Sequence, residues 1–524
     1  MRRPGRADKP GNVHLLGRLC PGGEGRKNGK TGKGHNAVRQ CIQDSHVHRR
    51  YRRRSEHVRG PGRLRQRGAI SASGLLRRSP SAGTKCSYWR QAPLIQEILF
   101  PFRKKCGWYD CIEIESLSLP ISFKNNRIYS LLESRNHGYG IRVNADGKTG
   151  FSYTNRAQGL TCTVESALAM APFGEKEGFT LPPSDPPVSF EPYSREIESV
   201  DADHEIHKGN EAIAALVKRF PGVMVDCGIS ISRGMNRVVN SSGIDVRYRY
   251  SRYSFSLSAT ISFDDGSRLS IGEGLAFREP VAVEGCVDTL MEKLDRALRI
   301  RKIPSGIVPV IVTPKAFCSL LGILTAGLSA RSVYKGISPF AGKCGHRLFN
   351  PGLTMFDDPL LNDSPYSYPF DDEAVIARKK YIIERGVLTT FVADLKYAEK
   401  LGMEPTGNGI RGYSSLPSPS FSNVVLIPGS VPVRDMIAET AHGIMVDQFI
   451  GLGQSNTITG DFSANLDCAY LIEKGEISGR IKDCMLTDNL FSLLAGELEI
   501  SAETERHGSA VVPWVRFPES HLTA

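Results

Sequence analysis

The sequence predicts an α+β fold, in which a mixed α/β amino-terminal domain is followed by a mainly antiparallel β carboxy-terminal domain with a buried helix. Three observations lead to this prediction. Residues 253–263 alternate between apolar side chains and serine or threonine, which is typical of a half-buried antiparallel strand. Asp146-Gly147 lies between two alternating segments, which is a strong hairpin signal. Residues 313–330 start with Thr-Pro and are apolar on most sides, which indicates a buried helix.

Composition divides the chain of 524 residues into three parts. Residues 1–91 are rich in Arg and Gly and show no sustained period, so they predict a basic disordered tail or a gene start placed too far upstream. Residues 92–303 are the predicted amino-terminal domain, and residues 304–524 are the predicted carboxy-terminal domain. The net charge of +12 comes from the tail, because only 44 of the 67 basic residues but 51 of the 55 acidic residues follow position 90. The body is therefore mildly acidic.

The sequence predicts a cytoplasmic protein without a membrane partner. It contains no run of about 18 apolar residues, which a membrane-spanning helix would need. Its amino terminus lacks the apolar stretch of a secretory signal. The 12 cysteines are scattered without Cys-x-x-Cys pairs, which favours reduced thiols.

The elements of the amino-terminal domain follow from local periodicity and turn residues. Helices are predicted at 94–106, at 163–170, from a cap at Asn210 through Phe220, and around Leu290, Leu294 and Leu298. Strands are predicted at 111–115, 127–133, 139–153 with the hairpin inside, 223–231 and 253–263. Six prolines between residues 171 and 203 indicate a long connection.

The carboxy-terminal domain opens with a buried strand at 307–312, followed by the helix that Thr313-Pro314 begins. Short strands are predicted at 380–383 and 388–392, on either side of Arg385-Gly386.

Two long irregular segments stand out in this domain. Pro405–Gly429 is punctuated by glycine and proline until the apolar run Val424–Ile427, and Gly451–Ser463 contains Gly460-Asp461. Long irregular segments inside a compact domain are usually functional. With these segments the chain resembles the TldD/PmbA family of metallopeptidases, formerly labelled modulators of DNA gyrase, over residues 95–517. The resemblance implies cleavage of unfolded peptides or leader segments inside a closed chamber.

The catalytic member of this family resembles a zinc peptidase. It carries His-Glu-x-x-x-His on a helix and a cysteine ligand near its carboxyl terminus, which together leave one zinc position open for water. In this chain the motif falls on Leu321 to Ala326, where leucine, glycine and alanine stand, and His507 stands about where the cysteine would be. The chain thus resembles the PmbA/TldE-like branch, and the prediction is no catalytic residue, no metal and no cofactor in this chain.

The resemblance implies a zinc-bearing TldD-like paralogue as the partner, with the zinc in that subunit, and an unfolded peptide as the substrate; a homodimer stays open. The irregular segments would line the chamber. The substrate-binding residues predicted on this basis are Gly407, Asn408, Gly409, Asn423, Gly460 and Asp461.

Two alternatives remain. The chain could be an independent metallopeptidase with a divergent metal site, for which His346, His442 and His507 are the candidate ligands. It could instead be a nucleic-acid-associated protein that binds through its basic tail. The acidic body argues against the second alternative.

Overall fold

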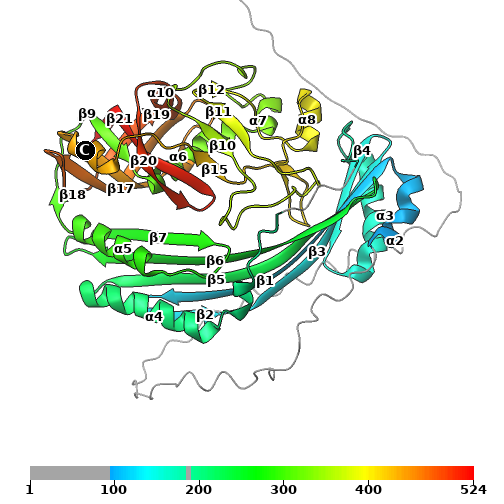
Figure 1. Ribbon diagram of the computed structural model, residues 1–524, viewed down its shortest axis with the longest axis horizontal. Coiled ribbons are helices and arrows are strands. Elements are labelled where there is room, and N and C mark those ends of the chain that lie inside the picture. Colours follow the sequence, from blue (N-terminus) through cyan, green and yellow to red (C-terminus); the bar gives the residue numbers. More distant parts are fainter. Residues whose placement is uncertain (1–94, 184–189) are drawn as a thin grey trace, which may run out of the picture. The chain divides into compact units, whose positions relative to one another are not determined.

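The computed structural model describes residues 95–183 and 190–524 (Figure 1). The predicted tail therefore lies outside the described residues. The described part forms a seven-stranded sheet, a twelve-stranded sheet and a two-stranded ribbon. No helix in it is long and apolar enough to cross a membrane.

The seven-stranded sheet is antiparallel, with the order β4-β3-β1-β5-β6-β7, and β2 pairs with β1. Its strands are β1 (Trp108–Lys124), β2 (Arg127–Leu131), β3 (Ser134–Ala145), β4 (Lys148–Thr154), β5 (Met224–Asn240), β6 (Asp245–Ser262) and β7 (Arg268–Phe277). The predicted hairpin is confirmed, because Asp146 and Gly147 join β3 to β4 with φ of +53° and +77°.

Helices cover one face of this sheet. They are α2 (Ile95–Leu99) with the short helix η2 (Phe100–Lys105), α3 (Leu160–Met170), α4 (Ala202–Arg219) and α5 (Glu284–Ala297); the short helices η3 (Ala157–Gly159), η4 (Ala171–Phe173) and η5 (Arg195–Ser199) lie in the connections. The alternation predicted for residues 253–263 is confirmed: Tyr253, Phe255 and Leu257 are buried in the core that includes α4 and α5. The serines between them therefore lie on the opposite face.

The cap predicted for the third of these helices, α4, was wrong. α4 begins eight residues before Asn210, and the Asp201 side chain caps it by accepting a hydrogen bond from the His204 backbone N–H (3.2 Å). The apolar periodicity of the sequence did not reveal this start, because one of the buried positions in the first turns of α4 is occupied by a polar residue. The Glu205 carboxylate is 1% exposed and accepts a hydrogen bond from the Tyr253 hydroxyl (2.7 Å).

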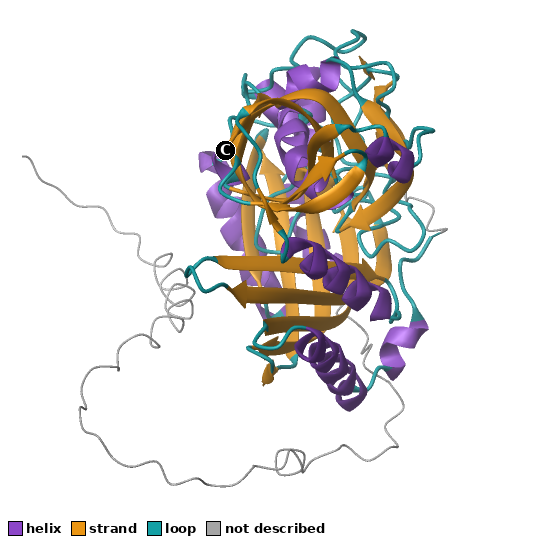
Figure 2. Cartoon of the chain, turned by 90° about the vertical axis from the view of Figure 1, so that its left-hand side faces the viewer, coloured by secondary structure: helices purple, strands orange, loops and turns teal. Residues whose placement is uncertain are grey.

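The carboxy-terminal domain is built on the twelve-stranded mixed sheet. Its strands are β8 (Ile300–Arg301), β9 (Gly306–Val312), β10 (Met355–Asp357), β11 (Lys380–Glu384), β12 (Val387–Leu388), β15 (Val424–Leu426), β16 (His442–Ile450), β17 (Asp461–Glu473), β18 (Glu476–Ile481), β19 (Met485–Asn489), β20 (Glu499–His507) and β21 (Ala510–Thr523). Most pairs are antiparallel, as predicted, but β8–β18, β9–β16 and β15–β21 are parallel. The strands β21, β9, β16, β17 and β19 close into a ring, since β19 pairs with both β17 and β21 (Figure 2).

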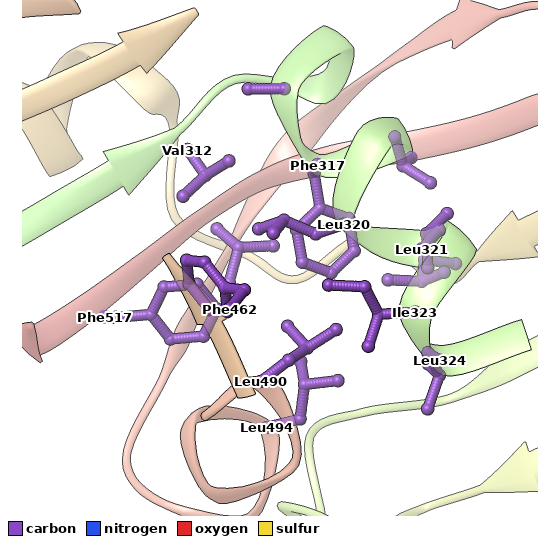
Figure 3. Close-up of a cluster of buried hydrophobic side chains, with 14 of the residues drawn as sticks. Val312, Phe317, Leu320, Leu321, Ile323, Leu324, Phe462, Leu490, Leu494 and Phe517 are labelled. Atoms are coloured by element: carbon purple, nitrogen blue, oxygen red, sulfur yellow. The ribbon is translucent and has the colours of Figure 1, made fainter. Parts of the chain in front are cut away.

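The predicted buried helix is confirmed as α6 (Pro314–Gly327). The Thr313 side chain caps it by accepting from the Ala316 backbone N–H (3.3 Å). Its apolar side, including Phe317, packs against strand residues such as Phe462 and Phe517 (Figure 3). The remaining short elements are α7 (Ala330–Tyr334), α8 (Leu395–Leu401), α9 (Val433–Ala438), α10 (Leu490–Ala495), η6 (Leu452–Gln454) and the ribbon of β13 (Gly409–Ile410) and β14 (Ser418–Pro419).

Candidate functional site

A groove of about 690 Å³ lies between the amino-terminal sheet and the carboxy-terminal domain. Strands β1, β5, β6 and β7 supply its floor. The residues that face this floor from the other domain are Lys315 at the start of α6, Tyr366, and His507-Gly508 at the turn between β20 and β21. The groove therefore lies beside the helix on which the sequence analysis placed the family motif.

The floor of the groove consists of small residues in register. Ser122 of β1, Gly228 of β5, Ser256 of β6 and Gly274 of β7 are direct cross-strand neighbours. A parallel row contains Asp226, Ser258 and Gly272. Because bulky side chains of β6 point to the opposite face, this face presents hydroxyl groups and backbone over four strands. Such a surface leaves room for an extended chain.

A charged network borders the groove. The Lys315 ammonium donates to the Gly272 carbonyl (2.6 Å) and lies 3.3 Å from the Glu273 carboxylate. Glu273 and Asp447 also flank Lys293 at 2.7 and 2.8 Å. Burial opposes the charge on Lys293, but the two carboxylates outweigh burial and raise the pKa of Lys293. Burial likewise opposes the charge on Asp447, and the two lysines keep its pKa below the usual value. Lys293 and Asp447 are therefore both ionised at neutral pH.

His507 and Cys318 meet beside the groove. The Nε2 atom of His507 lies 3.1 Å from a Glu505 carboxylate oxygen. The Cys318 Sγ atom lies 4.0 Å from the His507 carbonyl oxygen, to which the thiol donates a weak hydrogen bond. Burial raises the pKa of the Cys318 thiol to about 12, so the thiol stays protonated and is a poor nucleophile and metal ligand.

The other candidate ligands lie elsewhere. His346 is exposed and contacts the Cys344 carbonyl (3.3 Å), and His442 is exposed at the start of β16. Among residues 95–183 and 190–524, no three His, Cys, Asp or Glu side chains are placed to share a metal ion. A divergent metal site stays a prediction.

The three positions assigned to the family motif lie on two sides of α6. Gly322 and Ala326 are exposed and, by helical spacing, share a side with Lys315. A side chain at Gly322 would meet open space. Leu321 is 5% exposed and packs in the core inside the ring of strands. A metal ligand at Leu321 would therefore point into that core.

The predicted substrate-binding residues of the Pro405–Gly429 segment are occupied by contacts within the chain. The Asn408 amide is buried and donates to the Asp357 carboxylate and to the Ser420 carbonyl, both at 2.8 Å. Gly407 has φ of +71°, and a side chain there would come within 2.6 Å of the Ile376 carbonyl oxygen. The Gly409 backbone N–H donates to Asp371 (2.8 Å).

Of the remaining three predicted residues, Asn423 lies in the same segment, and Gly460 and Asp461 lie at the start of β17. Asn423 is buried and donates to the Asp358 carbonyl (2.7 Å) and the Ser367 hydroxyl (3.1 Å). Gly460 packs under the Phe491 ring, and the exposed Asp461 accepts from Asn489 (2.7 Å). None of the six predicted residues is among those lining the groove. Their role in substrate binding stays a prediction.

A buried ionic cluster that was not predicted from the sequence joins the two domains. Arg142 of β3 is 3% exposed and pairs with Asp110 of β1 and, at 2.8 Å, with Glu373 of the carboxy-terminal domain. Arg411 lies 3.2 Å from Asp110. The acidic run Asp371-Asp372-Glu373 between apolar residues was the signal that could have indicated this cluster.

Three further aspartates around this cluster hold protons more tightly than usual. Burial and the nearby Glu373 carboxylate raise the pKa of Asp371 well above its usual value, and that of Asp394 to about 7. Burial raises the pKa of Asp372 to about 6, although the hydrogen bond that its carboxylate accepts from the Arg411 backbone N–H acts to lower that pKa.

The same segment reaches the amino-terminal sheet through Tyr413. Side chains at Gly138 and Gly140 of β3 would clash with Tyr413, and its hydroxyl donates to the Asn136 side chain (3.2 Å). The irregular Pro405–Gly429 segment thus braces the two domains against each other.

Comparisons with known proteins agree with this architecture. Three sequence profiles match the chain: PmbA/TldA metallopeptidase domain 1 over residues 109–171, the PmbA/TldA metallopeptidase central domain over 195–298, and the PmbA/TldA metallopeptidase C-terminal domain over 305–524. A metalloprotease of Methanothermobacter thermautotrophicus is 27% identical over 422 residues, which cover 76% of this chain and 88% of that protein. A metalloprotease PmbA homologue of Haemophilus influenzae is 22% identical over 75% of this chain and 86% of that protein.

Two crystal structures are similar over most of the chain. TldE from Thermococcus kodakarensis superposes with a TM-score of 0.76 at 25% identity and covers 82% of this chain and 100% of its own. A protein from Thermotoga maritima, described as a modulator of a DNA gyrase, gives a TM-score of 0.75 at 25% identity, with 82% and 99% covered. The chain belongs to the PmbA/TldD metallopeptidase family.

Proposed function

We propose that this chain is a non-catalytic, PmbA/TldE-like subunit of a metallopeptidase complex. It holds an unfolded peptide or leader segment in the groove, while a zinc-bearing TldD-like paralogue supplies the hydrolytic site. The observation that carries the proposal is the groove itself. Its floor of small residues lies beside α6, and the exposed side of that helix presents Gly322 and Ala326 rather than metal ligands.

The donor set on the exposed side of α6 does not fit zinc. Protein zinc sites use thiolate, imidazole and carboxylate ligands. This side of the helix offers an ammonium at Lys315, a protonated thiol at Cys318, a hydroxyl at Ser319, a glycine and an alanine. An ammonium carries no free lone pair, and the glycine and alanine have no donor atom in the side chain. No hydrolytic step is therefore assigned to this chain.

The groove suits recognition of a peptide through its backbone. The Ser256 hydroxyl donates to the Gly228 carbonyl (3.3 Å), and the Ser258 hydroxyl shares a hydrogen bond with that of Ser270 (3.2 Å). The lone pairs of these hydroxyl oxygens can accept from peptide N–H groups, and the adjacent glycines let the peptide backbone approach the sheet closely. Lys315 and Glu273 at the border are engaged with each other, so they add little selectivity for charged side chains. Recognition of this kind accepts many sequences, as an unfolded substrate requires.

A substitution in the floor tests this proposal. Ser256→Leu places a large side chain in the middle of the row, so we expect weaker peptide binding and lower peptidase activity of the complex with the paralogue. Ser262→Leu is the matched control, since Ser262 is an exposed serine on the same face of β6 outside the groove. Peptide binding is measured by fluorescence anisotropy and folding by thermal unfolding. Equal peptide binding by the two variants would contradict the assignment of the groove.

A further inference from the structure

Strand β2 and the residue that follows it, Leu132, expose large apolar side chains. Ile128 is 48% exposed, Tyr129 68%, Leu131 44% and Leu132 62%. All five residues of β2 are exposed, whereas in the adjacent strand β1 only Lys124 is exposed. Contiguous exposed apolar side chains on a folded protein mark an interaction surface.

The position of β2 leaves one of its edges free. Strands β2 and β3 lie end to end along the same side of β1, and within the described part of the chain β2 pairs with β1 alone. Within residues 95–183 and 190–524, the outer edge of β2 therefore has no strand partner for its backbone N–H and C=O groups, which can pair with another strand. Natural proteins usually protect such edges with inward-pointing charges or proline, but the middle of this strand carries neither.

The sequence of this edge is complementary to itself. It reads Arg127-Ile-Tyr-Ser130-Leu-Leu-Glu133. If a second copy pairs with it antiparallel about a two-fold axis at Ser130, Arg127 of one copy lies opposite Glu133 of the other, whose exposed carboxylate also pairs with Arg135 of its own chain (2.9 Å). The same register places Ile128 opposite Leu132 and Tyr129 opposite Leu131. Opposite charges and apolar pairs in these positions stabilise antiparallel strands.

The local geometry suits an identical partner. A bulge in the β1–β2 pairing leaves Tyr129 without a directly opposite residue on β1. A bulge increases the twist of its strand, so a partner strand must match that twist. A second copy carries the same bulge in the symmetry-related position.

We propose that the β2 edge, residues 127–133, is a homodimer interface in which two copies of this chain pair antiparallel about Ser130. The interface is isologous, because each copy contributes the same residues. It joins the two amino-terminal sheets into one continuous sheet. This inference does not depend on the proposed peptide-binding role.

A charge exchange tests the pairing. Arg127→Glu places a carboxylate opposite Glu133 of the other copy at both ends of the interface, and Glu133→Arg sets two arginines against each other. Each single variant should therefore dissociate about tenfold more readily than the wild type, as expected when two charge pairs change sign. In the heterodimer that forms in an equimolar mixture of the two variants, both charge pairs are attractive again, and the same is true of the homodimer of the double variant. Both preparations should therefore associate more tightly than either single variant, and the double variant should recover the wild-type dissociation constant.

The measurement is sedimentation velocity of the full-length chain over the micromolar range. Lys343→Glu, an exposed charge reversal on a loop of the other domain, is the control and should leave association unchanged. A wild-type chain that stays monomeric at high micromolar concentration would overturn the proposal. So would single variants that associate like the wild type, or a double variant that fails to recover. If dimers form only after residues 1–91 are deleted, the tail occupies this edge and the proposal is wrong.

Discussion

Removal of the Arg142 guanidinium should be the most damaging single change in the contact between the two domains. Arg142 is 3% exposed and lies between the Asp110 and Glu373 carboxylates, with the rings of Trp108 and Phe179 each 5.6 Å from it. Arg142→Met keeps much of the packing volume but leaves Glu373 without its cation and Asp110 with Arg411 alone. Removing one member of a buried ion pair costs about 3–5 kcal/mol. At about 2–4 °C per kcal/mol, the melting temperature should fall by roughly 10 °C.

The loss should depend on pH. In the wild type, burial opposes the charge on Asp110, but Arg142 and Arg411 hold its pKa below the usual value. The ionised form of Asp110 therefore stabilises the native state above its unfolded pKa, and this stability is lost as the pH falls through the lower, native pKa. In Arg142→Met, the buried carboxylates can avoid the uncompensated charge only by binding protons. The deficit relative to wild type should therefore be smaller at pH 5 than at pH 8.

Thermal unfolding at these two pH values measures both effects. Arg142→Met/Glu373→Gln should recover part of the loss, because it removes one of the unpaired charges. Arg219→Met is the control, since Arg219 forms an exposed ion pair with Asp295 that is worth about 0–1 kcal/mol. A loss below about 1 kcal/mol in Arg142→Met, which is within the range of a surface pair, or a loss that is the same at both pH values, would refute this reasoning.

Two further predictions concern the residues around the same cluster. The pKa of Asp394 is raised to about 7, so its protonated form stabilises the native state below its unfolded pKa, and this contribution disappears as the pH rises through about 7. Asp394→Asn, which can still cap α8, should therefore flatten the decline in melting temperature between pH 4 and 8. A variant with the wild-type pH profile would show that Asp394 does not titrate in this range. Gly409→Val should unfold the Pro405–Gly429 segment rather than impair activity alone, because a side chain at position 409 would come within 2.3 Å of a Glu373 carboxylate oxygen. Limited proteolysis should then cut this segment. A protease-resistant variant with lowered peptide binding would instead support a direct role of Gly409 in binding.

Elements with a local signal could be predicted from the sequence. The turn at Asp146-Gly147, the cap and proline at Thr313-Pro314, and the alternation in β6 each depend on residues adjacent in the chain. The start of α4 was missed because Glu205 is buried through a hydrogen bond to Tyr253, and a polar residue in the core breaks the apolar period. The family resemblance also rested on local segments, and the comparisons confirm it.

The candidate site could not be predicted, because its parts come from distant segments. The groove brings together β1, β5, β6 and β7 with Lys315 and His507, and no local pattern encodes that contact. The ion pair between Arg142 and Glu373 spans 231 positions. The glycines of the Pro405–Gly429 segment are evident in the sequence, but glycines in this pattern are equally compatible with a substrate-binding surface and with a closely packed structural segment that braces the two domains. Their contacts with Ile376 and Glu373 indicate the brace.

The central claim is that this chain contributes a peptide-binding surface but no hydrolytic centre to a metallopeptidase. The most direct measurement is the peptidase activity and zinc content of the purified chain, of a zinc-bearing TldD-like paralogue, and of their mixture. We expect no stoichiometric zinc and no activity in this chain alone, and a co-eluting complex whose activity exceeds that of the paralogue. One zinc per chain with peptidase activity in the isolated protein, lost on substitution of His507, would contradict it.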